Sequence, residues 1–401
     1  MAAELFFFKK SAVQVAVVQL HQLVLLGSDD EPHIHAVPLD FALFHDGVLI
    51  GQVVVELVAA GVQPTLQLAL HRLGAVLVLG LHQHDLLGKL CMFGLWLFGD
   101  TISHEFVMRM RGPKSVRPAL EHMRELDADV VFATHWAATY YIGKMKKDRP
   151  YSVLYCPDLY SNGMFNMDCN DFLISTEEGL AEANRERMYG GGNASLVTYP
   201  IRNEAFALEG KRSEWRRELN IPEDRFTVVL SDGGYGMAKL EATVTELVKH
   251  KAEITIFAVC GKNAEGAERL KKLKCAEGID LRVFGFTDKM LEFLCAADLY
   301  VGKSGANSIA EPTFFGLPVI LTKCITPIEV GTKKYFKDII CNALFIRSPK
   351  KAAEKIAYFA THRAELKTLA ENTKKRRAAY GAEQIADLLY ERAVHACAAS
   401  A

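Results

Sequence analysis

Residues 298–321 read DLYVGKSGANSIAEPTFFGLPVIL and contain one complete strand–loop–helix–strand unit. The first apolar run ends at Gly302, small polar residues follow it, and Gly316 separates the helical stretch from the apolar run at 317–321. Short apolar runs joined by helical stretches are typical of parallel strands whose two faces are both covered. This segment therefore predicts a β-α-β unit of an open parallel sheet.

The same alternation continues on both sides of this segment. Because 401 residues exceed the roughly 100–200 residues of one ordinary domain, two domains are expected. The sequence predicts an α/β fold with two Rossmann-like, doubly wound domains at 104–200 and 201–350, followed by charged C-terminal helices at 351–401. Strands are expected at 127–135, 152–156 and 171–176 in the first domain and at 226–230, 253–260, 279–286, 298–302 and 317–321 in the second.

The beginning of the chain differs in composition from the rest. Seven of the 13 histidines, but only four of the 47 lysines and arginines, fall within residues 1–100. This stretch does not resemble a signal peptide, and its apolar runs are shorter than the roughly 18–20 residues of a membrane-spanning helix. Residues 1–103 are therefore treated as an atypical segment.

Composition and charge narrow the class of protein. The formal net charge of −1 provides no electrostatic reason to expect a nucleic-acid partner. The nine cysteines form no CxxC pair, which is typical of reduced, structural thiols in an intracellular protein. We therefore expect a globular intracellular protein that binds no nucleic acid.

Open parallel sheets bind their ligands beyond the carboxyl ends of the strands, so the loops at those ends are candidate sites. The loop at 231–237 reads SDGGYGM, and its three glycines let the backbone approach an anion closely. The loop at 260–263 adds a lysine, and at 284–286 a glycine between two phenylalanines suits a flat base. A tight turn and two core phenylalanines are equally simple explanations of the first and third loops.

The strongest pattern is the loop at 303–308. It places small residues at a helix start, where unpaired amides and the positive end of the helix dipole suit a phosphate. Glu311, one turn inside, can accept hydrogen bonds from ribose hydroxyls, and Pro312 fits the first turn of a short helix. An ordinary helix N-terminus with an acidic first turn is the alternative explanation. Glu329 follows the next strand and adds a carboxylate near the same edge.

Five segments occur in a fixed order and carry a family resemblance: LSDGGYGM, VCGKN, VFGFTDKM, the stretch 298–321 and ITPIEVGTKKYF. In combination they resemble the GT-B glycosyltransferases that include monogalactosyldiacylglycerol synthase and the processive diacylglycerol glucosyltransferases. The resemblance covers about residues 113–350. It implies two Rossmann-like domains facing a cleft, and transfer of a hexose from a UDP-sugar to a lipid acceptor without a metal-dependent clamp on the donor.

The resemblance also implies roles for single residues on the donor side. The donor would be bound by Gly233, Gly234 and Gly236 at the diphosphate, by Phe284, Gly285 and Phe286 at uracil, by Ser304, Gly305, Ala306 and Asn307 at the phosphate, by Glu311 at the ribose and by Glu329 at the transferred sugar.

The domain at 104–200 would bind the acceptor and hold the catalytic groups. His135 ends the strand VVFATH, and Asp158 lies in YCPDLY at the position of the family's acid. The Gly-Gly-Gly-His loop with which the family opens has no counterpart in residues 1–103. We therefore hypothesise that residues 1–103 are not the family's native N-terminal segment, as a shifted, antisense or misassigned reading frame would explain.

The acceptor is less constrained than the donor. Basic clusters at 109–117 and 144–149 suit anionic headgroups, which favours diacylglycerol at the cytoplasmic face of a membrane, although ordinary solvated helix faces explain them equally well. A polyprenyl-linked cell-envelope precursor is an alternative acceptor. A non-catalytic protein that binds a UDP-sugar is a third hypothesis.

Overall fold

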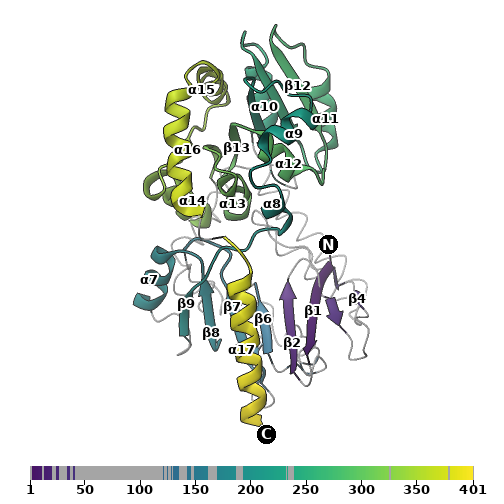
Figure 1. Cartoon of the computed structure of the whole chain (residues 1–401), viewed down its shortest axis with the longest axis vertical. Helices are drawn as coiled ribbons and strands as arrows, with labels where there is room; N and C mark the ends of the chain where they lie inside the picture. The colour runs from purple at the N-terminus through teal and green to yellow at the C-terminus, as the bar shows by residue number, and fades with distance from the viewer. Residues whose placement is uncertain are drawn as a thin grey trace, which may run out of the picture. The chain divides into compact units, whose positions relative to one another are not determined.

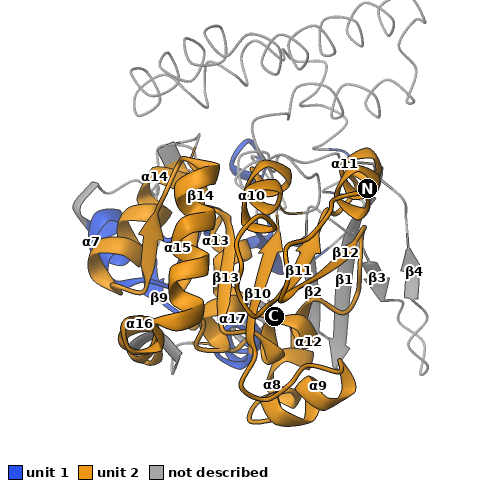
Figure 2. Cartoon of the chain, turned by 90° about the horizontal axis from the view of Figure 1, so that it is seen from above, with its two compact units in different colours: residues 1–197, 383–401 blue, residues 198–382 orange. Residues whose placement is uncertain are grey.

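The computed structural model divides into two compact units, residues 1–197 with 383–401 (unit 1) and residues 198–382 (unit 2), as Figure 2 shows. The residues that the structure describes are 2–10, 13–19, 24–26, 34–36, 39–40, 121, 124, 128, 130–134, 142–145, 149–160, 169–186, 193–231, 233, 239–324, 327–377 and 380–400.

Unit 2 contains a six-stranded parallel sheet with the order β12-β11-β10-β13-β14-β15. This order is that of a Rossmann-type sheet. Its second and third strands are added towards one side of the first strand, and the fourth to sixth are added towards the other side. The predicted α/β fold is confirmed here, although the three-residue β15 was not predicted because so short a run carries no periodicity. The strands are β10 (Phe226–Ser231), β11 (Ile254–Val259), β12 (Ile279–Phe284), β13 (Leu299–Lys303), β14 (Val319–Lys323) and β15 (Ala343–Phe345).

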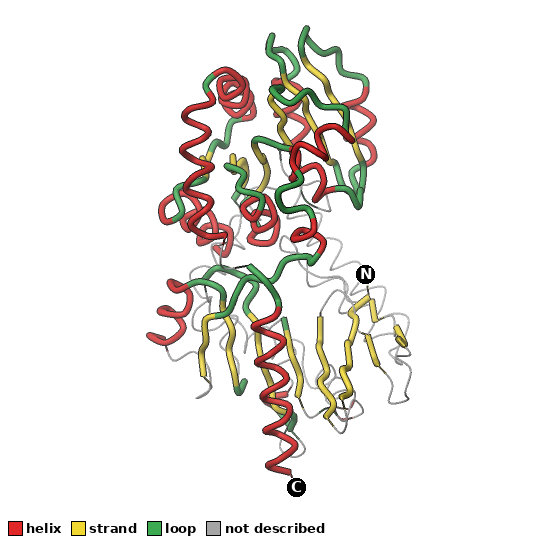
Figure 3. The backbone as a smooth tube through the Cα atoms, in the orientation of Figure 1, coloured by secondary structure: helices red, strands yellow, loops and turns green. Residues whose placement is uncertain are grey.

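Helices cover both faces of this sheet, and they alternate with the strands along the chain (Figure 3). On one face, buried residues of α10 and α15 share a core with β10 and β11. On the other, Phe293 of α12 stacks on Phe257 of β11 with ring centroids 4.5 Å apart. The helices are α8 (Glu204–Ala207), α9 (Arg212–Glu218), α10 (Leu240–Leu247), α11 (Ala264–Lys271), α12 (Met290–Ala296), α13 (Ala306–Phe314), α14 (Pro327–Lys334), the π-helix η2 (Tyr335–Ile339), α15 (Pro349–Thr361) and α16 (Arg363–Arg377).

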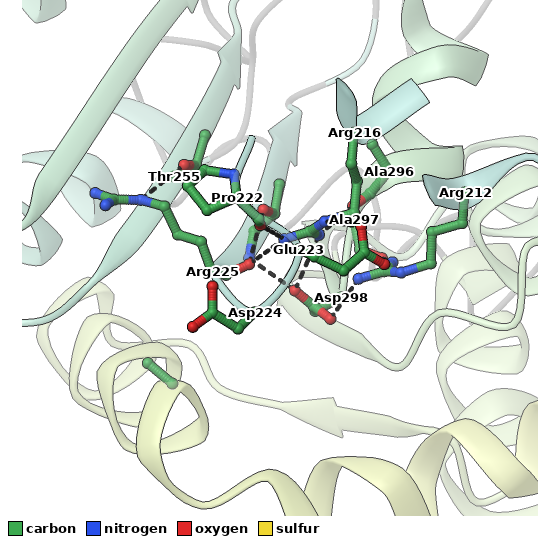
Figure 4. Close-up of polar contacts among 12 residues, drawn as sticks. Arg212, Arg216, Pro222, Glu223, Asp224, Arg225, Thr255, Ala296, Ala297 and Asp298 are labelled. Carbon is green, nitrogen blue, oxygen red and sulfur yellow. Dashed lines mark hydrogen bonds and ion pairs between the residues drawn. The ribbon is translucent and has the colours of Figure 1, made fainter. Parts of the chain in front are cut away.

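A charged network ties the amino ends of β10 and β13 together (Figure 4). Asp298, directly before β13, accepts hydrogen bonds of 2.8 Å from the Arg212 guanidinium and from the Thr227 amide. The Arg216 guanidinium lies 3.7 Å from the same carboxylate and is fully buried. Arg216 also donates to the main-chain carbonyls of Ala296, Pro222 and Arg225. The network therefore stabilises the edge of the sheet that is formed by the amino ends of the strands.

Unit 1 contains a mixed, mostly parallel sheet with the order β5-β1-β2-β6-β7-β8-β9. From β2 to β9 neighbouring strands are parallel, whereas β1 pairs antiparallel with β2. Helix α17 lies across β2, β6 and β7 (Figure 1), so α17 packs in unit 1 whereas α15 and α16 belong to unit 2. The elements are β1 (Ala2–Lys10), β2 (Val13–Gln19), β3 (Val24–Leu26), β4 (Ile34–Ala36), β5 (Leu39–Asp40), β6 (Val130–Ala133), β7 (Tyr151–Tyr155), β8 (Asp171–Ile174), α7 (Glu177–Glu186), β9 (Asn193–Leu196) and α17 (Glu383–Ser400).

A buried carboxylate links α17 to the sheet of unit 1. Asp171 Oδ2 accepts hydrogen bonds from Arg392 Nε at 2.6 Å and from the Tyr151 hydroxyl at 3.0 Å. Burial, together with the hydrogen bond to Asp171 and its charge, raises the pKa of Tyr151 to about 12. The folded chain therefore keeps this proton to a higher pH than the unfolded chain does, whose tyrosine pKa is about 10.

We expect this tyrosine to make the stability of unit 1 fall with rising pH. Its contribution is fully present below about pH 10 and is lost as the pH rises towards 12. The measurement is the urea midpoint between pH 8 and 12, compared with that of Tyr151→Phe, in which this part of the slope should disappear. Identical pH slopes in the two proteins would contradict the assignment.

Candidate functional site

A cavity of about 290 Å³ opens at the carboxyl ends of the strands of unit 2. It lies where the strand order reverses, between β10 and β13, which is where open α/β sheets bind ligands. Its volume is close to the lower end of the range for small-molecule sites, about 300–1,000 Å³. Its lining residues are Ser231, Gly233, Val259, Gly261, Phe286, Thr287, Met290, Leu294, Tyr300, Asn307, Ser308, Glu311 and Pro312.

Glycine is required at two places beside the cavity. Gly233, in the glycine-rich loop after β10, has φ +72°, a left-handed conformation that other residues rarely adopt. Gly302, near the end of β13, packs against two neighbours, since an added Cβ would lie 2.7 Å from the Tyr300 hydroxyl and 2.9 Å from the Ser231 carbonyl oxygen. Gly233 therefore allows the turn that lines the cavity, and Gly302 allows β13 to pack closely against the Ser231 carbonyl and the Tyr300 ring. Gly234 and Gly236 lie outside the described residues.

Gly302→Ala should lower the free energy of unfolding of unit 2 by about 1–3 kcal/mol, the cost of overpacking. The clash includes main-chain oxygen of the neighbouring strand, which cannot swing aside as a flexible side chain can. Urea unfolding followed by fluorescence measures the loss. Gly285→Ala is the matched control, because its Cβ would meet its nearest atom at an ordinary 3.7 Å. Equal stability of the two variants would contradict this prediction.

Helix α13 contributes the polar wall of the cavity. Its N-cap is Gly305, in an extended conformation, and among the described residues no side chain forms a cap hydrogen bond there. Asn307 and Ser308 of that turn line the cavity, so the positive end of the helix dipole is available to a bound anion. Ala306, also in this turn, is buried.

Pro312 does not lie in the first turn of the helix, so that expectation was wrong. It stands inside α13 and lines the cavity. Because proline has no N–H, the carbonyl of Ser308 receives no helical hydrogen bond from it. The helix begins only at Ala306, after the loop, which moves the proline into the second turn.

Two side chains of α13 that line the cavity are held by the segment at 198–202. The Tyr199 hydroxyl donates to Asn307 Oδ1 at 2.5 Å. Arg202 donates from Nε and Nη2 to the two carboxylate oxygens of Glu311, at 2.7 and 2.9 Å. These bonds raise the pKa of the Arg202 guanidinium, and the Glu311 side chain keeps 21% of its surface exposed. Nothing in the sequence marks Tyr199 or Arg202 as part of a site.

The loop after β12 separates its two phenylalanines. The Phe284 ring packs against Phe293 and Phe257 of the core, with centroid distances of 4.7 and 5.9 Å. Phe286 lines the cavity and is 78% exposed. A flat ligand group would therefore meet Phe286, with Gly285 between the two rings.

Six of the predicted donor residues that the structure describes are not among the residues that line the cavity: Phe284, Gly285, Ser304, Gly305, Ala306 and Glu329. Ser304 is fully buried, and its hydroxyl donates to the main-chain carbonyl of Lys323 at 3.0 Å. Glu329 lies in the first turn of α14 and is 6% exposed. A role for Glu329 at the transferred sugar stays a prediction.

The predicted catalytic residues belong to unit 1. His135 lies outside the described residues. Asp158 is half-buried just beyond β7, and its charge adds to burial in raising the pKa of the Cys156 thiol well above its usual value. Among the residues that the structure describes, no group of three or more histidine, cysteine and acidic side chains could hold a metal ion.

The cavity lies within a stretch of the chain that matches a known domain family. Residues 227–329 match the glycosyltransferase family 28 C-terminal domain. A probable chloroplastic monogalactosyldiacylglycerol synthase of Glycine max is 33% identical over 181 residues, which are 43% of this chain and 34% of that protein. Monogalactosyldiacylglycerol synthase 1 of Arabidopsis thaliana is 31% identical over 200 residues, or 47% and 37% of the two chains. The match thus spans little more than a third of these relatives' length.

Solved structures share the fold at low sequence identity. Arabidopsis thaliana UGT89C1 complexed with UDP has a TM-score of 0.52 and 13% identity, covering 73% of this chain and 81% of that one. Acinetobacter baumannii MurG has a TM-score of 0.50 and 15% identity, covering 69% and 78%. The chain therefore resembles the GT-B glycosyltransferases of the monogalactosyldiacylglycerol synthase type, and the domain that matches is the one that contains the cavity.

Proposed function

We propose that this chain is a hexosyltransferase that moves a hexose from a UDP-sugar to a hydroxyl group of a lipid acceptor such as diacylglycerol. The observation that carries the proposal is the cavity at the switch point of unit 2, where an uncapped helix start and the Glu311 carboxylate lie on one wall. A diphosphate suits the first, and the paired hydroxyls of a ribose suit the second. The likeness to monogalactosyldiacylglycerol synthases supports a sugar donor and a lipid acceptor.

The reaction requires little covalent chemistry from the donor domain. The acceptor oxygen forms a bond to the anomeric carbon while the bond from that carbon to the UDP oxygen breaks. The leaving diphosphate gains negative charge, which the first-turn amides and dipole of α13 would stabilise. The acceptor hydroxyl loses its proton to a general base, for which His135 and Asp158 are the candidates.

We place the acceptor at a membrane surface. In the described part of the chain, no helix combines the length and the apolarity that crossing a bilayer requires. The basic clusters at 109–117 and 144–149 are our candidates for peripheral contact with anionic lipid at the cytoplasmic face, where a diacylglycerol acceptor would be met.

The test is a crossed assay with the full-length chain. Radiolabelled UDP-galactose, UDP-glucose and UDP-N-acetylglucosamine are each offered with diacylglycerol vesicles and with a polyprenyl-linked sugar. We expect a glycosylated diacylglycerol from one of the two hexose donors. Transfer only to the polyprenyl acceptor would change the acceptor class, and UDP binding by calorimetry without transfer or donor hydrolysis would favour a non-catalytic binder. Absence of UDP binding would overturn the proposal.

A further inference from the structure

We propose that the segment at 198–202 positions the polar side chains that receive the nucleotide: Tyr199 orients the amide of Asn307, and Arg202 orients the carboxylate of Glu311. This inference rests on the proposed function, because it assumes that the cavity of unit 2 binds a nucleotide. It adds two positioning residues to the site, neither of which lines the cavity.

The contact to Asn307 determines which end of its amide is available. Tyr199 is 3% exposed, and its hydroxyl donates to Asn307 Oδ1 at 2.5 Å. With the oxygen engaged, the two N–H donors of the amide remain for a ligand. Asn307 lies in the uncapped first turn of α13, so its amide and the helix dipole would act on the same anion. Tyr199 therefore orients the Asn307 amide so that its N–H groups can donate to a phosphate oxygen.

The contact to Glu311 fixes a carboxylate without using all of its acceptor capacity. Arg202 binds both oxygens through a two-pronged pair of hydrogen bonds. An ionised carboxylate has about four acceptor positions, so two remain for the hydroxyls of a ribose. The planar guanidinium holds the carboxylate in one orientation, which reduces the entropy that a ligand would otherwise lose in ordering it.

The segment at 198–202 is itself bound to the last residues of unit 2 in the sequence, Tyr380 and Gly381. The Tyr199 carbonyl accepts from the Gly381 amide at 3.1 Å, and the Thr198 hydroxyl donates to the Gly381 carbonyl at 2.8 Å. The Tyr199 ring also packs edge-on against Tyr380, with centroids 6.2 Å apart. The first and last residues of unit 2 therefore hold each other, which fixes the main chain just before Arg202.

The experiment compares UDP with two ligands that each lack a different group of it, using variants that each alter one positioning side chain. Binding of UDP, uridine and 2′,3′-dideoxy-UDP is measured by calorimetry, or by displacement of a fluorescent UDP where affinity is low, for the unaltered chain, Tyr199→Phe and Arg202→Met. For Tyr199→Phe we expect UDP to bind about tenfold more weakly, with uridine unchanged. For Arg202→Met we expect UDP to bind about tenfold more weakly, with dideoxy-UDP unchanged.

The chain contains a matched control for the arginine. Arg269 makes a similar two-pronged pair with Glu241, at 2.6 and 2.8 Å, and neither residue lines the cavity. Arg269→Met should leave the affinity for all three ligands unchanged. Tyr358→Phe serves the same purpose for the tyrosine, because Tyr358 is on α15 and is 40% exposed.

The possible results separate cleanly. Equal weakening of UDP and dideoxy-UDP in Arg202→Met, or of UDP and uridine in Tyr199→Phe, would show a merely structural role and overturn the inference. Tighter UDP binding by Arg202→Met would also overturn it, since Arg202 would then compete with the ribose. If the unaltered chain bound no UDP, the proposed function would fail first; if it bound UDP and the variants bound all ligands normally, only the positioning role would fail.

Discussion

Glu311→Ala should weaken UDP binding about 100-fold. A hydrogen bond to a charged group contributes about 1.5–3 kcal/mol, so losing two of them costs at least about 3 kcal/mol, and about 1.4 kcal/mol corresponds to a factor of ten. The variant also leaves the half-exposed Arg202 without the carboxylate that it binds. Isothermal titration calorimetry with UDP measures the change.

Two comparisons make the Glu311 result specific. Glu241→Ala removes the carboxylate of the other two-pronged pair, away from the cavity, and should leave UDP affinity unchanged. Dideoxy-UDP should bind Glu311→Ala and the unaltered chain with similar affinity, because it has no ribose hydroxyls to lose. UDP affinity within about threefold of the unaltered chain would place the ribose elsewhere.

Of the substitutions considered for stability, Asp298→Ala should lower the free energy of unfolding the most, by about 3–5 kcal/mol. The change removes the carboxylate that faces Arg212 and the fully buried Arg216, and it leaves the Thr227 amide without its partner. Burial already lowers the pKa of Arg216, so the loss of the neighbouring negative charge makes its charged form still more costly. Chemical denaturation of the purified chain measures the loss.

The network at Asp298 lies at the amino ends of β10 and β13, opposite the edge that forms the cavity. Asp298→Ala should therefore change stability while UDP affinity, measured well below the unfolding transition, stays the same. Glu223→Ala is the control, since its carboxylate lies 3.9 Å from Arg216 but is 63% exposed, and we expect a loss below about 1 kcal/mol. Comparable losses in the two variants would refute a special role for Asp298.

The alternation of strands and helices along the chain, and the location of the loops between them, follow from local pattern. Apolar runs of five or six residues, separated by amphipathic helices, leave a parallel sheet as the economical solution, and the loops after its strands then meet at one edge. The glycine-rich loop, the loop after β12 and the start of α13 were found in this way, and the cavity has residues of all three in its walls. The short strand β15 was not predicted, because three residues are too few to show a repeating pattern of apolar side chains.

The two phenylalanines at 284 and 286 show a difference that the local sequence pattern does not predict. Both flank the same glycine and look equivalent in the sequence. Only packing separates them: the Phe284 ring meets Phe293 in the core, whereas Phe286 stands 78% exposed at the cavity. Which side of a strand end faces the core depends on the helices that cover the sheet, and these come from other parts of the chain.

By itself, the sequence determined that unit 2 is a doubly wound sheet and that the start of α13, with Glu311 inside it, lies at the edge formed by the carboxyl ends of its strands. These features depend on spacing within about 25 residues, as in the stretch 298–321. Only the tertiary structure brought Arg202 to Glu311, 109 residues away, and Tyr199 to Asn307. The physical reason is that a strand or helix is marked by a local period of apolar residues, whereas the partner of a polar side chain depends on which distant segment the fold brings beside it.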